Sequence, residues 1–141
     1  MGDVHHLYFE VLRGKAKHKF CALVCAEAPL RFALINTENQ ADVLDNPALR
    51  PCQVQIKSDD YDFLSHDSWI DLHEFAAIPR TVDQIAAEID AGAYRGTLST
   101  EDLIKVIRGI EASVTLVKKQ ADRALQELRA ELSRRLQTKS E

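Results

Sequence analysis

With 141 residues, of which 45% are hydrophobic and 28% charged, the chain has the composition of a single globular domain rather than of a disordered segment. Its net charge of −4 argues against a dedicated duplex-DNA-binding protein, because such proteins are usually basic. The sequence has no run of about 18 uninterrupted apolar residues and no signal-peptide pattern at its start, so we expect a cytoplasmic protein with no membrane association.

The first part of the chain has the pattern of short β-strands separated by turns. Apolar residues that alternate or run continuously over 4–12, 20–26 and 30–36 predict three strands. Gly14 marks the turn between the first two strands, and Pro29 interrupts the chain before the third.

Two further strands are predicted over 52–57 and 68–75, separated by an acidic loop over 58–67. One side of the second of these strands carries an aromatic and two polar residues, Trp69, Asp71 and His73. Trp69 fits either core filling or stacking against a nucleobase. Five short strands with Gly-, Pro- and Asx-rich turns favour a small barrel or a curled sheet over alternating βαβ units.

After these strands the periodicity becomes helical. Thr81 is suited to cap a helix over 81–92, and Ser99 begins a capping-box-like start to a helix over 99–110. A longer helical pattern follows over 111–137, with Ala and Leu or Val residues spaced three and four apart. We therefore expect an α+β protein in which strands are followed by helices, the last of them long.

The apolar stripe of the last helix needs a partner surface. It consists of Val114, Val117, Ala121, Leu125, Leu128, Leu132 and Leu136. The stripe predicts either packing against the preceding helix or pairing with a second subunit. Residues 58–102 carry eleven acidic side chains against two basic ones, and residues 103–141 carry nine basic against five acidic, a distribution that suits self-association as a homodimer.

The three cysteines do not have the close, repeated spacing of a zinc site. They are Cys21, Cys25 and Cys52. Ordinary cysteine usage predicts buried, reduced thiols. A zinc site that combines these thiols with His18 or His66 is the weaker alternative, so we expect neither a metal nor another cofactor.

Five fragments, taken in order, resemble one family. They are Gly2-Asp3-Val4, the basic loop Arg13 to Lys19 before an apolar strand, "LINTEN" (34–39), "HDSWIDL" (66–72) and "GTLSTEDLIKVIRGI" (96–110). In this order they resemble the PemK/MazF-like toxins, and the resemblance covers most of residues 2–110. The Arg-Pro pair of that family is replaced by Lys17-His18-Lys19, so its arginine is not carried over.

The resemblance implies both a fold and an activity. The fold is an SH3-like β-barrel over 1–78, helices packed on the barrel over 79–110, and a long C-terminal helix over 111–141. The activity is a toxin-like endoribonuclease, a hydrolase that cleaves single-stranded RNA by 2′-OH attack without a metal ion. An antitoxin protein would neutralise it.

Such cleavage requires a base for the 2′-OH, cations for the phosphate and an acid for the leaving 5′-oxygen. The catalytic candidates are His66, Asp67, His18 and Thr37. The candidates for binding RNA phosphate are Arg13, Lys17, Lys19 and Ser68. Histidine suits both proton transfers because it titrates near neutral pH. Asp67 would either orient a histidine or act as the base.

Each candidate also has a structural alternative. His18 and its neighbouring lysines fit a solvated hairpin, and Thr37 fits the end of a strand. Asp67 and Ser68 fit an Asx-turn that satisfies backbone amides. The corresponding alternative function is a non-catalytic PemK/MazF-like interaction module, which binds a partner or self-associates through its C-terminal helix.

Overall fold

The computed structural model describes residues 2–12, 15–26, 30–36, 52–78 and 94–139, and for residues 5–12, 15–19, 30, 76–78, 94 and 139 it describes the backbone alone. The predicted helix over 81–92 and the candidates Arg13 and Thr37 lie outside these residues.

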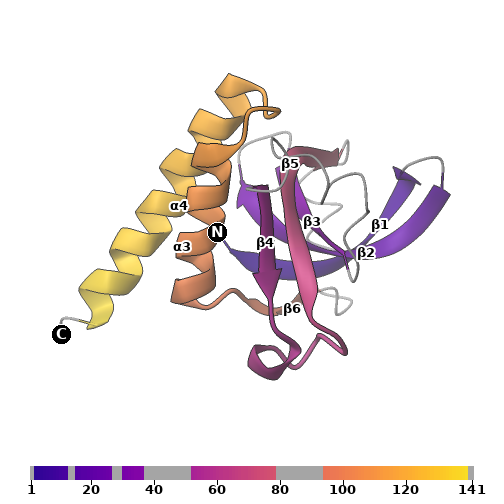
Figure 1. Cartoon of the computed structure of the whole chain (residues 1–141), viewed down its shortest axis with the longest axis horizontal. Coiled ribbons are helices and arrows are strands. Elements are labelled where there is room, and N and C mark those ends of the chain that lie inside the picture. Colours follow the sequence, from indigo (N-terminus) through magenta and orange to yellow (C-terminus); the bar gives the residue numbers. More distant parts are fainter. Residues whose placement is uncertain (1, 13–14, 27–29, 37–51, 79–93, 140–141) are drawn as a thin grey trace.

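In the described part of the chain, six antiparallel strands form one curled sheet (Figure 1). The strands are β1 (Asp3–Leu12), β2 (Lys15–Cys25), β3 (Leu30–Asn36), β4 (Gln53–Ile56), β5 (Ser68–Ile78) and β6 (Tyr94–Thr97). Their order in the sheet is β4-β5-β3-β2-β1-β6. The five strands predicted from the sequence are confirmed, but β2 begins at Lys15 and not at Phe20, so the prediction of a basic loop over 13–19 is wrong from Lys15 onward. β6 was not predicted, because its four residues, YRGT, show no apolar alternation.

Alternation along the strands decides which face of the sheet is buried against the helices. Ile70 and Leu72 of β5 are fully buried, as is Ile56 of the neighbouring β4, and Val54 of β4 is buried. These side chains join helix residues in one core cluster, because successive side chains on a strand point to opposite faces. Trp69, Asp71 and His73 therefore project from the other face of β5.

Two helices cover the buried face of the sheet. α3 (Thr100–Ala112) is capped by Ser99, whose Oγ accepts a hydrogen bond of 3.1 Å from the Asp102 backbone N–H, as the capping pattern predicted. Leu103 and Val106 of α3 are fully buried in the core. The start of α3 therefore lies where the sequence placed it.

α4 (Lys118–Lys139) runs beside α3 and does not continue it (Figure 1). Residues 113–117 separate the two helices, so the continuous helix predicted over 111–137 is wrong at its start. Ala124 and Leu128 are buried against the core, and Arg135 Nη1 donates a hydrogen bond of 2.7 Å to the Leu98 carbonyl.

The apolar stripe thus folds back onto its own chain for most of its length. Ala121, Leu125 and Leu132 pack against the same core as Leu128. The α+β class expected from the sequence is confirmed. Among the described residues, no helix is long and apolar enough to cross a membrane.

Candidate functional site

The polar turn before β5 is held by its own side chains. Asp67 Oδ1 accepts hydrogen bonds from the Ser58 backbone N–H at 2.9 Å and from Ser58 Oγ at 3.2 Å. The buried Ser68 Oγ donates to the His66 carbonyl at 3.0 Å. Asp67 therefore satisfies a backbone amide, as the structural alternative expected, but it joins two ends of the loop and does not form a local Asx-turn. The side chain of His66 is exposed.

Aromatic contacts bring this loop to the middle of β2. The ring centroid of Phe63 lies 5.3 Å from that of Phe20 and 5.4 Å from that of Tyr61. A Cβ atom built on Gly96 of β6 would lie 3.8 Å from the Phe63 ring, so the loop also reaches β6. Phe63 precedes His66 by three residues, and Phe20 directly follows Lys19.

Tyr61 anchors the loop to the N-terminus of α3. Its hydroxyl donates to Asp102 Oδ2 at 2.5 Å and accepts from the Ser99 backbone N–H at 2.9 Å. Burial and the hydrogen bond to Asp102 raise the pKa of Tyr61 from its ordinary 10.0 to about 12. Asp102 stabilises the neutral phenol, whereas the hydrogen bonds with Ser99 lower the pKa by less than burial and Asp102 raise it, so the phenol stays neutral and the loop stays attached to the helix over the physiological pH range.

Strand pairing places several predicted residues at one end of the sheet. Asn36, the last residue of β3 and the residue before Thr37, pairs with Trp69 at the beginning of β5. β2 runs antiparallel to β3, with Cys21 opposite Leu34, so the beginning of β2 lies at this same end. For Lys17, His18 and Lys19 only the backbone is described, and it pairs with β1 in the hairpin that extends to the right in Figure 1.

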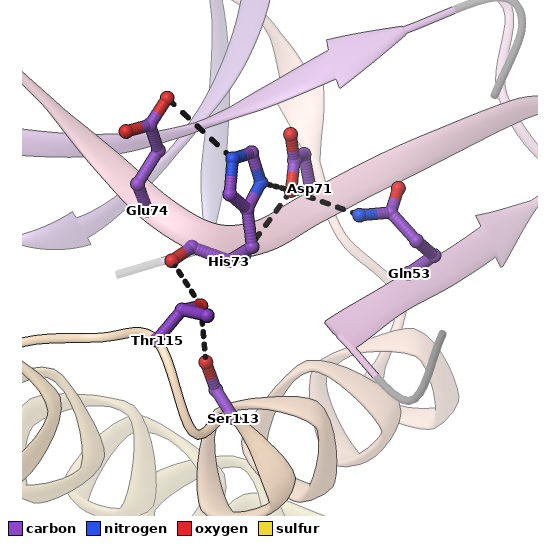
Figure 2. Close-up of polar contacts among 6 residues, drawn as sticks. All are labelled: Gln53, Asp71, His73, Glu74, Ser113 and Thr115. Carbon is purple, nitrogen blue, oxygen red and sulfur yellow. Dashed lines mark hydrogen bonds and ion pairs between the residues drawn. The ribbon is translucent and has the colours of Figure 1, made fainter. Parts of the chain in front are cut away.

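A second polar cluster lies on β5 and was not predicted as a site (Figure 2). Asp71 is only 5% exposed. Its Oδ1 accepts a hydrogen bond of 2.9 Å from Gln53 Nε2 and one of 3.1 Å from the His73 backbone N–H. The same oxygen contacts His73 Nδ1 closely. His73 Nε2 lies 3.6 Å from the exposed carboxylate of Glu74, so two carboxylates flank the imidazole ring.

The backbone of β5 is irregular at this cluster. Its pairing with β3 shifts between Leu34, opposite Asp71, and Phe32, opposite Ala76. Thr115, in the connection between α3 and α4, donates a hydrogen bond of 2.6 Å to the His73 carbonyl (Figure 2). The bulge therefore frees a strand carbonyl that a helix connection then satisfies.

This second cluster has the chemistry of an oriented histidine. A carboxylate that accepts from Nδ1 leaves Nε2 as the nitrogen that exchanges protons, as in many acid–base sites. Asp71 and His73 are two apart on a strand and so share a face, which is the sequence signal that indicates their contact. The signal is weak, because a buried carboxylate satisfied by neighbouring donors has the same appearance.

The cysteines are buried and reduced, as expected. Burial and a hydrogen bond to Glu127 raise the pKa of Cys25 to about 11. Glu127 Oε1 also accepts a hydrogen bond of 3.2 Å from the Ala26 backbone N–H, so this carboxylate joins α4 to the end of β2. Within the described ranges, no group of three or more His, Cys, Asp and Glu side chains is placed to hold a metal ion.

Comparison with known proteins found no matching family model and no matching curated protein. The PemK/MazF-like resemblance therefore stays a prediction made from the ordered fragments of the sequence. Function is accordingly inferred from the contacts of the residues themselves.

Proposed function

We propose that the chain binds single-stranded RNA where the loop over 58–67 meets β2 at Phe20, and that it cleaves this RNA. The observation that supports the proposal is the contact between Phe63 and Phe20. It brings the loop that carries the exposed His66 against the strand that carries Lys17 and Lys19. By strand alternation His18 belongs to the face of Phe20, and Lys17 and Lys19 belong to the opposite face, so the RNA is proposed to cross the edge of this hairpin and to contact residues of both faces.

In the proposed reaction His66 removes the proton from the ribose 2′-OH. The 2′-oxygen forms a bond to phosphorus while the bond between phosphorus and the 5′-oxygen breaks, which leaves a 2′,3′-cyclic phosphate and a 5′-hydroxyl. His18 supplies the proton that the 5′-oxygen requires. Lys17 and Lys19 stabilise the negative charge that gathers on the phosphate oxygens.

Asp67 is proposed to position His66 and not to exchange protons itself. Its Oδ1 already accepts two hydrogen bonds from Ser58, which fix the turn that carries the imidazole. Those two bonds support the carboxylate as an acceptor that holds the loop. Thr37, the residue after Asn36, is proposed to donate a hydrogen bond to the phosphate from the end of β3.

Charge favours an interaction that depends on the cations of the hairpin. Residues 13–19 carry four Lys and Arg side chains, whereas the loop over 58–67 carries four Asp side chains. Phosphate binding must therefore come from the hairpin, and the loop repels phosphates that approach it alone. RNA affinity should fall steeply with salt, and removal of one lysine contact should lower the slope of log K against log salt by about one.

The test is cleavage of labelled single-stranded RNA by the purified full chain in EDTA. The wild type should cleave, and His66→Ala and Lys19→Ala should each lower the rate strongly. Ser65→Ala is the matched control for the turn, since Ser65 is exposed beside His66, and Lys119→Ala is the control for an exposed lysine on α4. Absence of cleavage by the wild type, or full activity of His66→Ala, would reject the nuclease.

A second candidate function, the non-catalytic interaction module, is favoured by one observation. Val114 is 73% exposed and Val117 is 59% exposed in the connection between α3 and α4. Removing α4 would not test this function cleanly, because Ala124 and Leu128 complete the core. Val114→Ser with Val117→Ser should instead abolish self-association or partner binding and leave the fold intact, as measured by sedimentation and circular dichroism.

A further inference from the structure

The face of the sheet opposite the helices carries a row of three residues, in which a tryptophan lies between two side-chain amides. Trp69 of β5 is half-buried and lies between Gln55 of β4 and Asn36 of β3, both directly opposite it in the strand pairing. Residues directly opposite each other on neighbouring strands project from the same face. Gln53 and Asp71 form the next pair of residues on the same face, and their side chains are joined by a hydrogen bond. Ile70, between Trp69 and Asp71, is buried on the other face.

The chemistry of this row suits a nucleobase. An accessible indole offers a flat face against which any base can stack. Gln55 is exposed, and its side-chain amide carries both donors and an acceptor for the edge of a stacked base.

The row is also close to the proposed cleavage site. Trp69 follows His66 by three residues. Three residues span at most about 10 Å, so Trp69 lies within this distance of the turn that carries His66. A base on Trp69 would therefore leave the adjoining phosphodiester near the turn that carries His66.

We infer that Trp69 is a base-stacking position for single-stranded nucleic acid and that Gln55 hydrogen-bonds the edge of the stacked base. The inference rests on the proposed function and deepens it, because it names the part of the RNA that the sheet binds. Under this inference, contacts with the base at Trp69 and Gln55 determine which bases are preferred, whereas the hairpin cations bind the phosphate backbone of any sequence.

Fluorescence offers a direct test, because Trp69 is the single tryptophan of the chain. The His66→Ala variant, which should bind RNA without cutting it, is titrated with single-stranded homopolymers and with a duplex of equal length. Stacking predicts saturable quenching of the indole by the single strands and much less by the duplex, in which the bases are already stacked. Quenching that is equal for both would overturn the inference.

Binding by labelled RNA supplies a second readout that does not need the indole. Trp69→Leu should weaken binding by roughly ten-fold, within the range for removal of one stacked base, and Trp69→Phe should restore much of it. Gln55→Ala should change the order of preference among the homopolymers, whereas Gln126→Ala, at an exposed position on α4, should not.

The outcomes separate this inference from the proposed function. If RNA is cleaved and Trp69→Leu binds as tightly as the wild type, the stacking position is rejected and the nuclease remains. If single strands bind and quench but the wild type never cleaves them, the stacking position is supported and the nuclease is rejected. If the wild type neither binds nor cleaves single-stranded RNA, both are rejected.

Discussion

Two aspartate–histidine pairs lie a few residues apart, and their side chains behave differently. His66 and Asp67 are adjacent in the sequence, yet Asp67 bonds to Ser58 and His66 is exposed. Asp71 and His73 are separated by one residue, yet their side chains contact each other on β5. Adjacent residues point apart, whereas alternate residues on a strand share a face.

The difference matters for function as well as for structure. The pair on β5 is tied to Gln53, Glu74 and the connection between the helices, so its main measurable role is in stability. The pair in the turn leaves its imidazole exposed, in the loop that contacts β2 through Phe63 and Phe20. The more tightly bonded pair is therefore the less accessible one. Three substitutions measure this contrast, and a fourth, at Tyr61, measures how the loop that carries the pair in the turn is anchored.

Asp71→Ala should have the largest effect on stability. It would leave the Gln53 amide and the His73 N–H groups without their acceptor in a buried place, and we expect a loss of roughly 2–4 kcal/mol in the free energy of unfolding. Urea denaturation measures the loss. A loss no larger than that of Asp67→Ala would contradict the contrast between the two pairs.

Tyr61→Phe should destabilise the chain by about 1–2 kcal/mol, because Asp102 and the Ser99 N–H lose a buried partner. The pH dependence provides a sharper measurement. Since the pKa of Tyr61 is about 12 in the folded state and about 10 when unfolded, its contribution is complete below pH 10 and disappears as the pH rises toward 12. The stability difference between wild type and variant should shrink over that interval, and a constant difference would show that the phenol does not titrate in this way.

Asp67→Ala should cost about 1 kcal/mol, since the turn is exposed and loses the acceptor for the Ser58 backbone N–H. Asp62→Ala is the control, because Asp62 is an exposed carboxylate of the same loop. Its effect should stay within about 0.5 kcal/mol, as is usual for surface positions. If the two variants have equal stability, Asp67 does not hold the turn.

His66→Ala should have the smallest effect on stability, again within about 0.5 kcal/mol, because its side chain is exposed. Under the proposed function it should nonetheless lower the rate of RNA cleavage by roughly 100-fold or more. A thermal melt and a cleavage assay on the same preparation measure both effects. A variant that loses stability and activity together would place His66 among the structural residues.

The strands and helix caps followed from local pattern alone. Alternation at Val54 and Ile56 predicted β4, and Ser99 predicted the start of α3, because both signals depend only on neighbouring residues. β6 gave no such signal, since its place in the sheet comes from pairing with β1, far away in the sequence. The break between α3 and α4 was likewise missed, because the apolar spacing of Val114 and Val117 continues through it.

The candidate site divides in the same way. From the sequence, His66 and Asp67 could be chosen as polar residues in a turn. That Asp67 accepts a hydrogen bond from a backbone amide could also be foreseen, but its partner, Ser58, could not. The contact of Phe63 with Phe20 and the bonds of Tyr61 to α3 could not, because each joins residues about forty apart in the chain. Such contacts depend on how loops cross the end of the sheet.

The sequence by itself determined where the backbone is extended, where a helix begins and which face of each strand is apolar. Those properties arise from side-chain periodicity and from hydrogen bonds between near neighbours. The tertiary structure alone decided that α4 folds back onto the core, that Asp71 receives Gln53 and His73, and that the loop with His66 lies against β2. The physical reason is that strand register and helix packing are set by the summed burial of side chains distant in sequence, which no local pattern reports.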